Sequence, residues 1–461
     1  MALAVLFFVA ALAPAQPASA PNVQKTVLDN GLTVLTLEDR ALPTITLFLY
    51  FKVGSRNEVP GITGISHLFE HMMFNGSEKF APKVFDRTIE AGGGYSNGST
   101  WPDYTNYWEE FSPAALDSVL EMEADRMRAL RLDEQNLEQE RGIVINERLF
   151  RIDNDVTGLL DERIRANAFI ASTYRWSPAG WMEDLQKGIQ LDDAKRYFKT
   201  YYAPNNAVMV LVGDFETAPT LEKVRRLWAA VPSGDPPRPV LDPEPVQRGE
   251  KRVRVYKEAQ SPSVWVAYKI PGFLGARKAD LPALEVLGVL LSQGRSSPLY
   301  QRLVEQSQLA TGVFNDTPSH AMTSLTIYGA ELSPGKDVAR AEREIEAVLQ
   351  RARDGKLTDA ELSRAKNQIE AAFQRGFVGN AGRGQALGYY EAIRGDWKAM
   401  YTVLDAYRAT TLADLHRVAK TYLVPESRTV AILVPEEPKD AVDFSEAAKP
   451  PEEPAPKGGA R

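Results

Sequence analysis

The five residues His67-Leu68-Phe69-Glu70-His71 carry more information than any other part of this sequence. They place two imidazoles and a carboxylate close together in a chain of 461 residues that has only 4 His. On a helix, His67 and His71 lie one turn apart on the same face, so both can reach one metal ion. Glu70 projects from the adjacent edge of that face, where it can take a proton from a water activated by the metal.

Two other interpretations of this motif are a buried polar cluster and a structural zinc site. Random placement of the His and acidic residues of this chain would produce roughly 0.005 such motifs, so coincidence is a poor explanation. A structural zinc more often uses cysteines and four protein ligands, and this chain has no Cys. We therefore expect a catalytic metal with three protein ligands and an open position.

The residues around the motif predict a helix that holds both histidines rigidly. Residues 61–65 resemble a loop, and Ser66 is a typical helix N-cap. Apolar side chains continue as far as Phe74, and Asn75-Gly76 is expected to end the helix.

The third metal ligand must come from elsewhere, and two glutamates are the best candidates. Glu140 and Glu147 are seven residues apart, which places them on one face of a predicted helix two turns from each other. One would bind the metal and the other would support a ligand from behind. Their spacing alone does not decide which glutamate has which role.

His67, Glu70, His71 and Glu147 resemble the H-x-x-E-H(x)75-E signature of the M16 metallopeptidases. This family includes pitrilysin, insulin-degrading enzyme and mitochondrial processing peptidase. The resemblance covers roughly residues 23 to 437 and implies a zinc endopeptidase that hydrolyses unfolded peptides. It also implies that Glu147 is the third ligand, that Glu140 is its supporting carboxylate, and that one Zn²⁺ binds per chain.

A second part of the resemblance lies between the motif and the two glutamates. Residues 93–107 are similar to the family's G-x-x-N-A-x-T-x-x-D-x-T-x-Y segment, with Gly98 in place of the usual Ala. We expect Tyr95, Asn97 and Thr100 to bind a peptide that adds a strand to the edge of a sheet. A tight turn before a strand accounts equally well for Asn97 and the glycines.

Active members of the family also need an Arg and a Tyr in an L-R-x-x-x-x-L-A-Y segment. The matching positions here are Val304 and Thr311, so both side chains are missing. The resemblance then implies a homologous partner subunit that supplies the Arg and Tyr, in a heterodimer, or a homodimer. The alternative is a non-catalytic assembly or core subunit of a complex, against which the intact metal motif argues.

Composition limits the remaining functions and the compartment. The net charge of −7 without a basic cluster argues against nucleic-acid binding. No apolar run beyond the N-terminus reaches the ~18 residues of a membrane span.

Residues 1–20 are apolar and end in possible cleavage sites, so we expect a signal peptide and export, to a bacterial periplasm. An uncleaved apolar tail is the alternative, because no Lys or Arg precedes the apolar run.

The rest of the chain divides into two similar parts. We expect a zinc-bearing domain at residues 21–235, a Pro-rich linker at 236–250, a homologous domain at 251–437 and a disordered tail at 438–461. Segments that begin at Leu132 and Leu357 resemble each other, and both parts contain a Tyr and Pro before a strand. The predicted fold is α+β, with a mostly antiparallel sheet and helices packed on it in each domain.

The second copy is predicted to lack a metal site. At the offset of the repeat, Ala365 and Ala372 stand where the first copy has its two glutamates. The helix matching the His motif is expected at residues 298–302, which contain no His.

Overall fold

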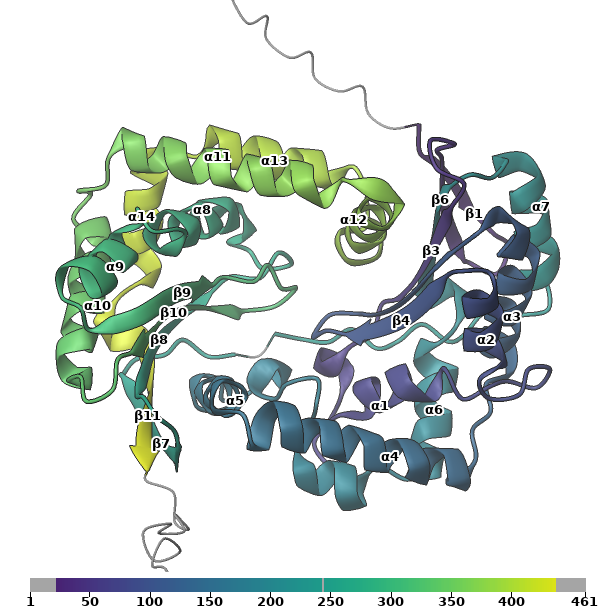
Figure 1. Ribbon diagram of the computed structural model, residues 1–461, viewed down its shortest axis with the longest axis horizontal. Helices are drawn as coiled ribbons and strands as arrows, with labels where there is room; N and C mark the ends of the chain where they lie inside the picture. Colours follow the sequence, from purple (N-terminus) through teal and green to yellow (C-terminus); the bar gives the residue numbers. More distant parts are fainter. Residues whose placement is uncertain (1–21, 243, 437–461) are drawn as a thin grey trace, which may run out of the picture.

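A computed structural model describes residues 22–242 and 244–436 and shows two α+β halves that face each other (Figure 1). The first half contains a six-stranded sheet with the order β1-β2-β6-β3-β5-β4. Neighbouring strands are antiparallel except β2 and β6, which run parallel. Its strands are β1 (Gln24–Val27), β2 (Thr33–Glu38), β3 (Ile45–Phe51), β4 (Tyr95–Thr100), β5 (Thr105–Phe111) and β6 (Ala207–Gly213).

The second half repeats this arrangement without the first strand. Its sheet has the order β7-β11-β8-β10-β9, with β7 and β11 parallel and the other neighbours antiparallel. The same order links β2, β6, β3, β5 and β4, so the predicted duplication and the α+β class are confirmed. The strands are β7 (Lys251–Glu258), β8 (Ser263–Ile270), β9 (Ala310–Asp316), β10 (Ser324–Leu332) and β11 (Arg428–Glu436).

Helices follow the strands in a similar order in both halves. The first half has α1 (Ile65–Met72), α2 (Val84–Ala91), α3 (Leu116–Ala129), α4 (Glu134–Arg148), α5 (Val156–Ala168), α6 (Leu191–Tyr201) and α7 (Thr217–Trp228). The second has α8 (Leu281–Ser292), α9 (Pro298–Tyr300), α10 (Val338–Arg353), α11 (Asp359–Gly376), α12 (Gly379–Arg394), α13 (Ala399–Ala409) and α14 (Leu412–Tyr422).

Helices α4 and α11 begin in the same way in the two halves. The side chains of their N-cap residues, Asp133 and Thr358, each accept a hydrogen bond from the backbone three residues on. These caps start the two helices at equivalent positions in the duplicated fold.

One predicted equivalence is wrong. Residues 298–302 do not match the helix of the His motif, because α9 and the turn after it precede the edge strand β9, as α2 precedes β4. The counterpart of α1 is α8, since each is the first long helix after β3 or β8 and packs on α4 or α11 respectively. Helix α8 also has no His.

The two halves exchange one helix each, which the sequence pattern did not indicate. Helix α5 of the first half packs on β7 and β11, and α12 of the second half packs on β3 and β6 (Figure 1). All seven residues of β3 are buried, because α12 covers the face that would otherwise be open to solvent. A side chain on Gly388 would collide with the ring of Tyr50, so glycine permits this close approach.

The segment predicted as a linker contains no helix or strand in its described part. It is held in place by polar contacts, among them Glu244, which accepts hydrogen bonds from the backbone of residues 170–172. The predicted signal peptide and the predicted disordered tail lie outside the described residues. Among the residues that are described, no helix combines the length and the apolar character needed to cross a bilayer.

Candidate metal centre

Helix α1 begins two residues earlier than the sequence suggests, and Ser66 is not its N-cap. Gly64 is the N-cap, with a φ of 90° that suits glycine. The carboxylate of Glu58 accepts hydrogen bonds from the backbone N–H groups of Gly64 and Ser66 and from the Ser66 hydroxyl. The carboxylate of Glu58, six residues before Gly64, thus caps the helix instead of the Ser66 side chain. Burial raises the pKa of Glu58 to about 7.

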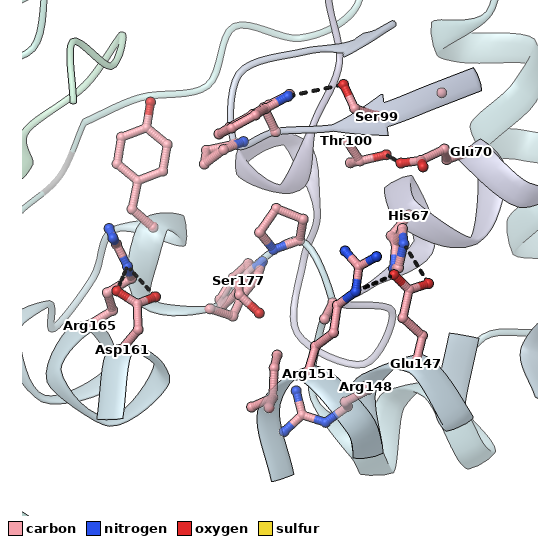
Figure 2. A pocket seen from close by; sticks show the side chains of 18 of the residues that line it. His67, Glu70, Ser99, Thr100, Glu147, Arg148, Arg151, Asp161, Arg165 and Ser177 are labelled. Atoms are coloured by element: carbon pink, nitrogen blue, oxygen red, sulfur yellow. Dashed lines mark hydrogen bonds and ion pairs between the residues drawn. The ribbon is translucent and has the colours of Figure 1, made fainter. Parts of the chain in front are cut away.

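The metal-ligand candidates meet between α1 and α4. One donor atom each of His67, His71 and Glu147 lie within 4.8 Å of one another. Oε2 of Glu147 is 3.5 Å from Nε2 of His67 and 3.3 Å from Nε2 of His71. Figure 2 shows Glu147 rising from α4 toward His67. Two imidazoles and one carboxylate are a donor set that suits a catalytic zinc.

Glu140 lies behind this cluster rather than in it. Its Oε2 is 3.4 Å from Nδ1 of His71, and its Oε1 accepts a 2.7 Å hydrogen bond from Nδ2 of Asn75. A carboxylate on Nδ1 fixes the ring orientation and leaves Nε2 to bind a metal. The geometry therefore separates two glutamates that the spacing left equivalent.

The two histidines differ in their electrostatic environments. Burial, aided by the neighbouring His71, lowers the pKa of His67 to about 4, so its imidazole is neutral, as a metal ligand must be. Burial acts in the same direction on His71, but the hydrogen bond to Glu140 and nearby carboxylates outweigh it and raise the pKa of His71. A metal ion at this site would compete with the His71 proton.

Glu70 is held at the edge of the cluster by the strand beside it. The hydroxyl of Thr100 donates a 2.6 Å hydrogen bond to Oε2 of Glu70, as Figure 2 shows. Burial raises the pKa of Glu70, although the bond from Thr100 opposes the shift. The departure at Gly98 also has a local reason, because a Cβ there would lie 2.9 Å from Cγ of Glu70.

The cluster opens into a cavity of about 830 Å³ that both halves line. Strand β4, at the edge of its sheet, forms one wall with Asn97 and Thr100, two of the predicted substrate-binding residues. The side chain of Asn97 accepts a hydrogen bond from its neighbour Gly98. Tyr95, at the far end of β4, is 51% exposed and lies outside the cavity lining.

The positions of the missing Arg and Tyr lie away from this cavity in the second half. Val304 packs against the hydrophobic core of that half. Thr311 is exposed on β9, where its hydroxyl donates to the backbone oxygen of Glu331. Neither residue is among those that line the cavity.

Several cavity residues were not predicted from the sequence. Arg151 follows α4, lines the cavity and forms a 2.9 Å ion pair with Oε1 of Glu147. From the second half come Asp316, Pro318 and His320. The small number of histidines was a signal that could have drawn attention to His320, whereas nothing in the sequence singles out the others.

The chain matches known families and proteins over most of its length. Residues 33–177 match the model described as Insulinase (Peptidase family M16), and residues 188–369 match Peptidase M16 inactive domain. Zinc protease PqqE of Helicobacter pylori is 31% identical over 90% of this chain and 93% of its own length. A probable mitochondrial-processing peptidase subunit beta of Arabidopsis thaliana is 24% identical over 90% of this chain and 79% of its own.

Solved structures agree with these matches. A protease from Helicobacter pylori has a TM-score of 0.85 and 30% identity, and the alignment covers 90% of this chain and all of that one. The periplasmic protease PqqL from Escherichia coli shares the fold, with a TM-score of 0.73, 16% identity and coverage of 91% of this chain and 48% of that one. The two family models and the identity to PqqE establish that this chain belongs to the M16 peptidase family.

Proposed function

We propose that this chain is a zinc-dependent endopeptidase subunit that hydrolyses unfolded peptides. The observation that carries the proposal is the convergence of His67, His71 and Glu147 beside Glu70 at the wall of a cavity. We assign the first three residues as the ligands of one zinc ion per chain. Relatives named zinc proteases support this assignment.

When bound, zinc would act as a Lewis acid that activates a water molecule and polarises a peptide carbonyl. The carboxylate of Glu70 would take the water's proton, and Oε1 is the oxygen that does not already accept the hydrogen bond from Thr100. Glu70 then delivers this proton to the leaving amine nitrogen. Glu140 supports the reaction indirectly, because its contact with Nδ1 of His71 holds that ring in place.

The peptide would lie extended along β4, whose outer edge is not paired with any other strand of the described residues. Main-chain hydrogen bonds to this edge bind a peptide without regard to most side chains, which favours unfolded substrates. Asn97 and Thr100 lie in the cavity wall and would contact the peptide near Glu70. Tyr95 would contact it only beyond the cavity.

A homologous partner completes the site in this proposal. Val304 and Thr311 cannot replace the Arg and Tyr of active family members, so a second subunit would have to supply them. The similarity to a protein named subunit beta supports pairing with a different subunit, and a homodimer is the simpler alternative. A purely non-catalytic assembly subunit would not need Glu70 and the three ligand candidates held together at one cavity.

We also propose that the protein is exported to the periplasm of a bacterium. The apolar character of residues 1–20 and the structural similarity to a protease named periplasmic support this compartment. Fractionation of the native host, with immunodetection of the chain in periplasmic and cytoplasmic extracts, would test it. Recovery of the chain only from the cytoplasm would contradict export.

The central experiment measures zinc-dependent hydrolysis of an unfolded polypeptide. The full chain, purified from its host together with any subunit that accompanies it, should cleave internal peptide bonds. A chelator should remove this activity and added zinc should restore it. Glu70→Gln, purified in the same way, should be inactive. Cleavage that persists after metal removal and in Glu70→Gln would rule the proposal out.

A further inference from the structure

The connection between β9 and β10 reaches from the second half into the first and contacts a buried carboxylate there. Oδ2 of Asp103 accepts hydrogen bonds of 3.1 Å from Nδ1 of His320 and from the backbone N–H of Ala321. Tyr174 donates to Oδ1 of the same carboxylate and accepts a hydrogen bond from the backbone N–H of Met322. Asp103 therefore holds this connection in a fixed position beside the cavity.

The contact with Asp103 also orients the imidazole of His320. Burial opposes the charge on Asp103, but the hydrogen bond from His320, the charge of His320 when its ring is protonated, and the guanidinium of Arg56 hold the pKa of Asp103 below its usual value. A charged carboxylate requires a proton on Nδ1, so in the neutral imidazole Nε2 is a hydrogen-bond acceptor. No residue of the described chain donates a hydrogen bond to this Nε2. The ring is 16% exposed and lines the cavity that contains the metal-ligand candidates.

The position of Asp103 relates His320 to the expected path of a substrate. Asp103 lies in the turn that follows β4, three residues after Thr100, whose hydroxyl contacts Glu70. Trp101 and Pro102, between them, also line the cavity. A peptide bound along β4 and continuing past Thr100 would therefore pass the side of the cavity formed by His320.

We propose that His320, oriented by Asp103, accepts through Nε2 a hydrogen bond from a backbone N–H of the bound peptide. This contact, which rests on the proposed peptidase function, would be a substrate-binding contribution of the second half from within this chain. It differs from the missing Arg and Tyr, because it positions the peptide and does not stabilise negative charge. The competing explanation is a structural role alone, in which Nδ1 links the two halves and Nε2 has no function.

Two substitutions separate the two ring nitrogens. In His320→Asn, the amide nitrogen can replace Nδ1 and keep the bond to Asp103, but nothing replaces Nε2. In His320→Gln, the oxygen of the longer amide can reach the position of Nε2 and act as the acceptor, while the bond to Asp103 is lost. His416→Asn, in α14 of the second half, makes the same chemical change away from the cavity and is the matched control.

The test measures peptide binding without turnover. Each substitution is combined with Glu70→Gln in the full chain, loaded with zinc and kept with any subunit that copurifies. Binding of a fluorescently labelled unfolded peptide is followed by anisotropy, and zinc content and thermal unfolding are recorded in parallel. Loss of one hydrogen bond should weaken binding on the order of 3- to 10-fold in His320→Asn, with zinc content and unfolding temperature unchanged. His320→Gln should bind more tightly than His320→Asn.

Equal peptide affinity in His320→Asn and the Glu70→Gln parent, with an unchanged fold, would overturn the inference and leave His320 a structural link. If His320→Asn does not fold, His320→Gln is compared with His320→Ala. Tighter binding by the Gln variant supports the inference, and equal binding overturns it. A different outcome concerns the function itself: if the parent binds no peptide and the unmodified chain cleaves none, the proposed peptidase function fails, and this inference with it.

Discussion

The hydroxyl of Thr100 donates a 2.6 Å hydrogen bond to Oε2 of Glu70 and so joins the edge strand β4 to the helix that carries both histidines. A single contact thereby connects the strand where a peptide would lie with the group that would move the proton. The other oxygen of Glu70, Oε1, accepts no hydrogen bond from Thr100. The orientation of Glu70 is therefore set by the fold before any metal or substrate binds.

Replacing Glu70 should separate proton transfer from metal binding. Glu70→Gln keeps the size of the side chain and can still contact Thr100, but it cannot accept a proton. We expect zinc content and thermal stability to remain unchanged and kcat to fall by at least ~10²-fold, the scale of a lost general base. Metal analysis and steady-state kinetics provide the measurement. A Glu70→Gln protein that no longer retained zinc would show that Glu70 is a ligand.

The metal should bind once per chain, in the first half only. His67→Ala and His71→Ala should each abolish zinc binding, and Glu147→Gln should weaken it severely, because each removes one of three protein donors. In the second half, Ala365 and Ala372 stand at the positions equivalent to the two glutamates of α4. Elemental analysis of the purified chain should show one zinc. Two zinc ions per chain, or full zinc occupancy in a variant that carries both His67→Ala and His71→Ala, would contradict the assignment.

Glu140 should affect zinc affinity without binding zinc itself. The substitution Glu140→Gln removes the carboxylate charge that supports Nδ1 of His71. Loss of such a contact typically lowers metal affinity 10- to 100-fold. Competition with a zinc chelator of known affinity would measure the change. Glu138→Gln, at an exposed position of the same helix, should leave zinc affinity unaltered. Equal affinities for both variants would show that the contact between Glu140 and His71 has no such role.

Glu58 should make stability depend on pH in a defined range. Burial raises its pKa from 4.5 to about 7, so the folded protein holds this proton more tightly than the unfolded chain does. The protonated form of Glu58 therefore stabilises the fold. This stabilisation is present below about pH 4.5 and is lost as the pH rises to about 7, a change of ~3 kcal/mol in the free energy of unfolding. Denaturant unfolding of the zinc-free protein at several pH values, compared with Glu58→Gln, would reveal this contribution. Parallel pH profiles for the two proteins would refute it.

Local sequence patterns predicted the duplicated fold and the residues of the cluster, but not how distant segments meet. The spacing of His67 and His71 depends only on neighbouring residues, so the sequence contains the relevant information. The separate roles of Glu140 and Glu147 depend on where α1 crosses α4, which no spacing within α4 specifies. The placement of His320 beside Asp103 likewise arises from a tertiary contact.

The exchange of helices between the halves shows the same limit. The apolar residues of β3 suit a buried strand, but they do not identify the helix that covers it. Helix α12 is more than 300 residues away in the chain, and glycines that could have served in any turn or helix allow it to approach the sheet. A hydrophobic pattern reports that a surface is buried, whereas the identity of the covering element depends on the complete chain path.

The final prediction concerns Val304 and Thr311. Val304 and Thr311 stand where active family members have the Arg and Tyr that stabilise the oxyanion. The chain purified alone should therefore be weakly active on peptides even when loaded with zinc. Loss of one oxyanion donor costs ~10²–10³-fold in rate, so the absence of both should be easy to detect. Adding a homologous subunit that contains the L-R-x-x-x-x-L-A-Y segment should restore activity in proportion to the complex formed.

The partner's contribution can be isolated with matched proteins. A partner in which the Arg and Tyr are replaced should still form the complex, as size-exclusion chromatography would show, but should not restore cleavage. Glu70→Gln in this chain should also prevent restoration by the intact partner, because the proton acceptor is then missing. Full activity of the isolated chain, unaffected by any partner, would mean that other residues stabilise the developing charge. In that case Arg151, which lines the cavity and pairs with Glu147, would be the first side chain to replace.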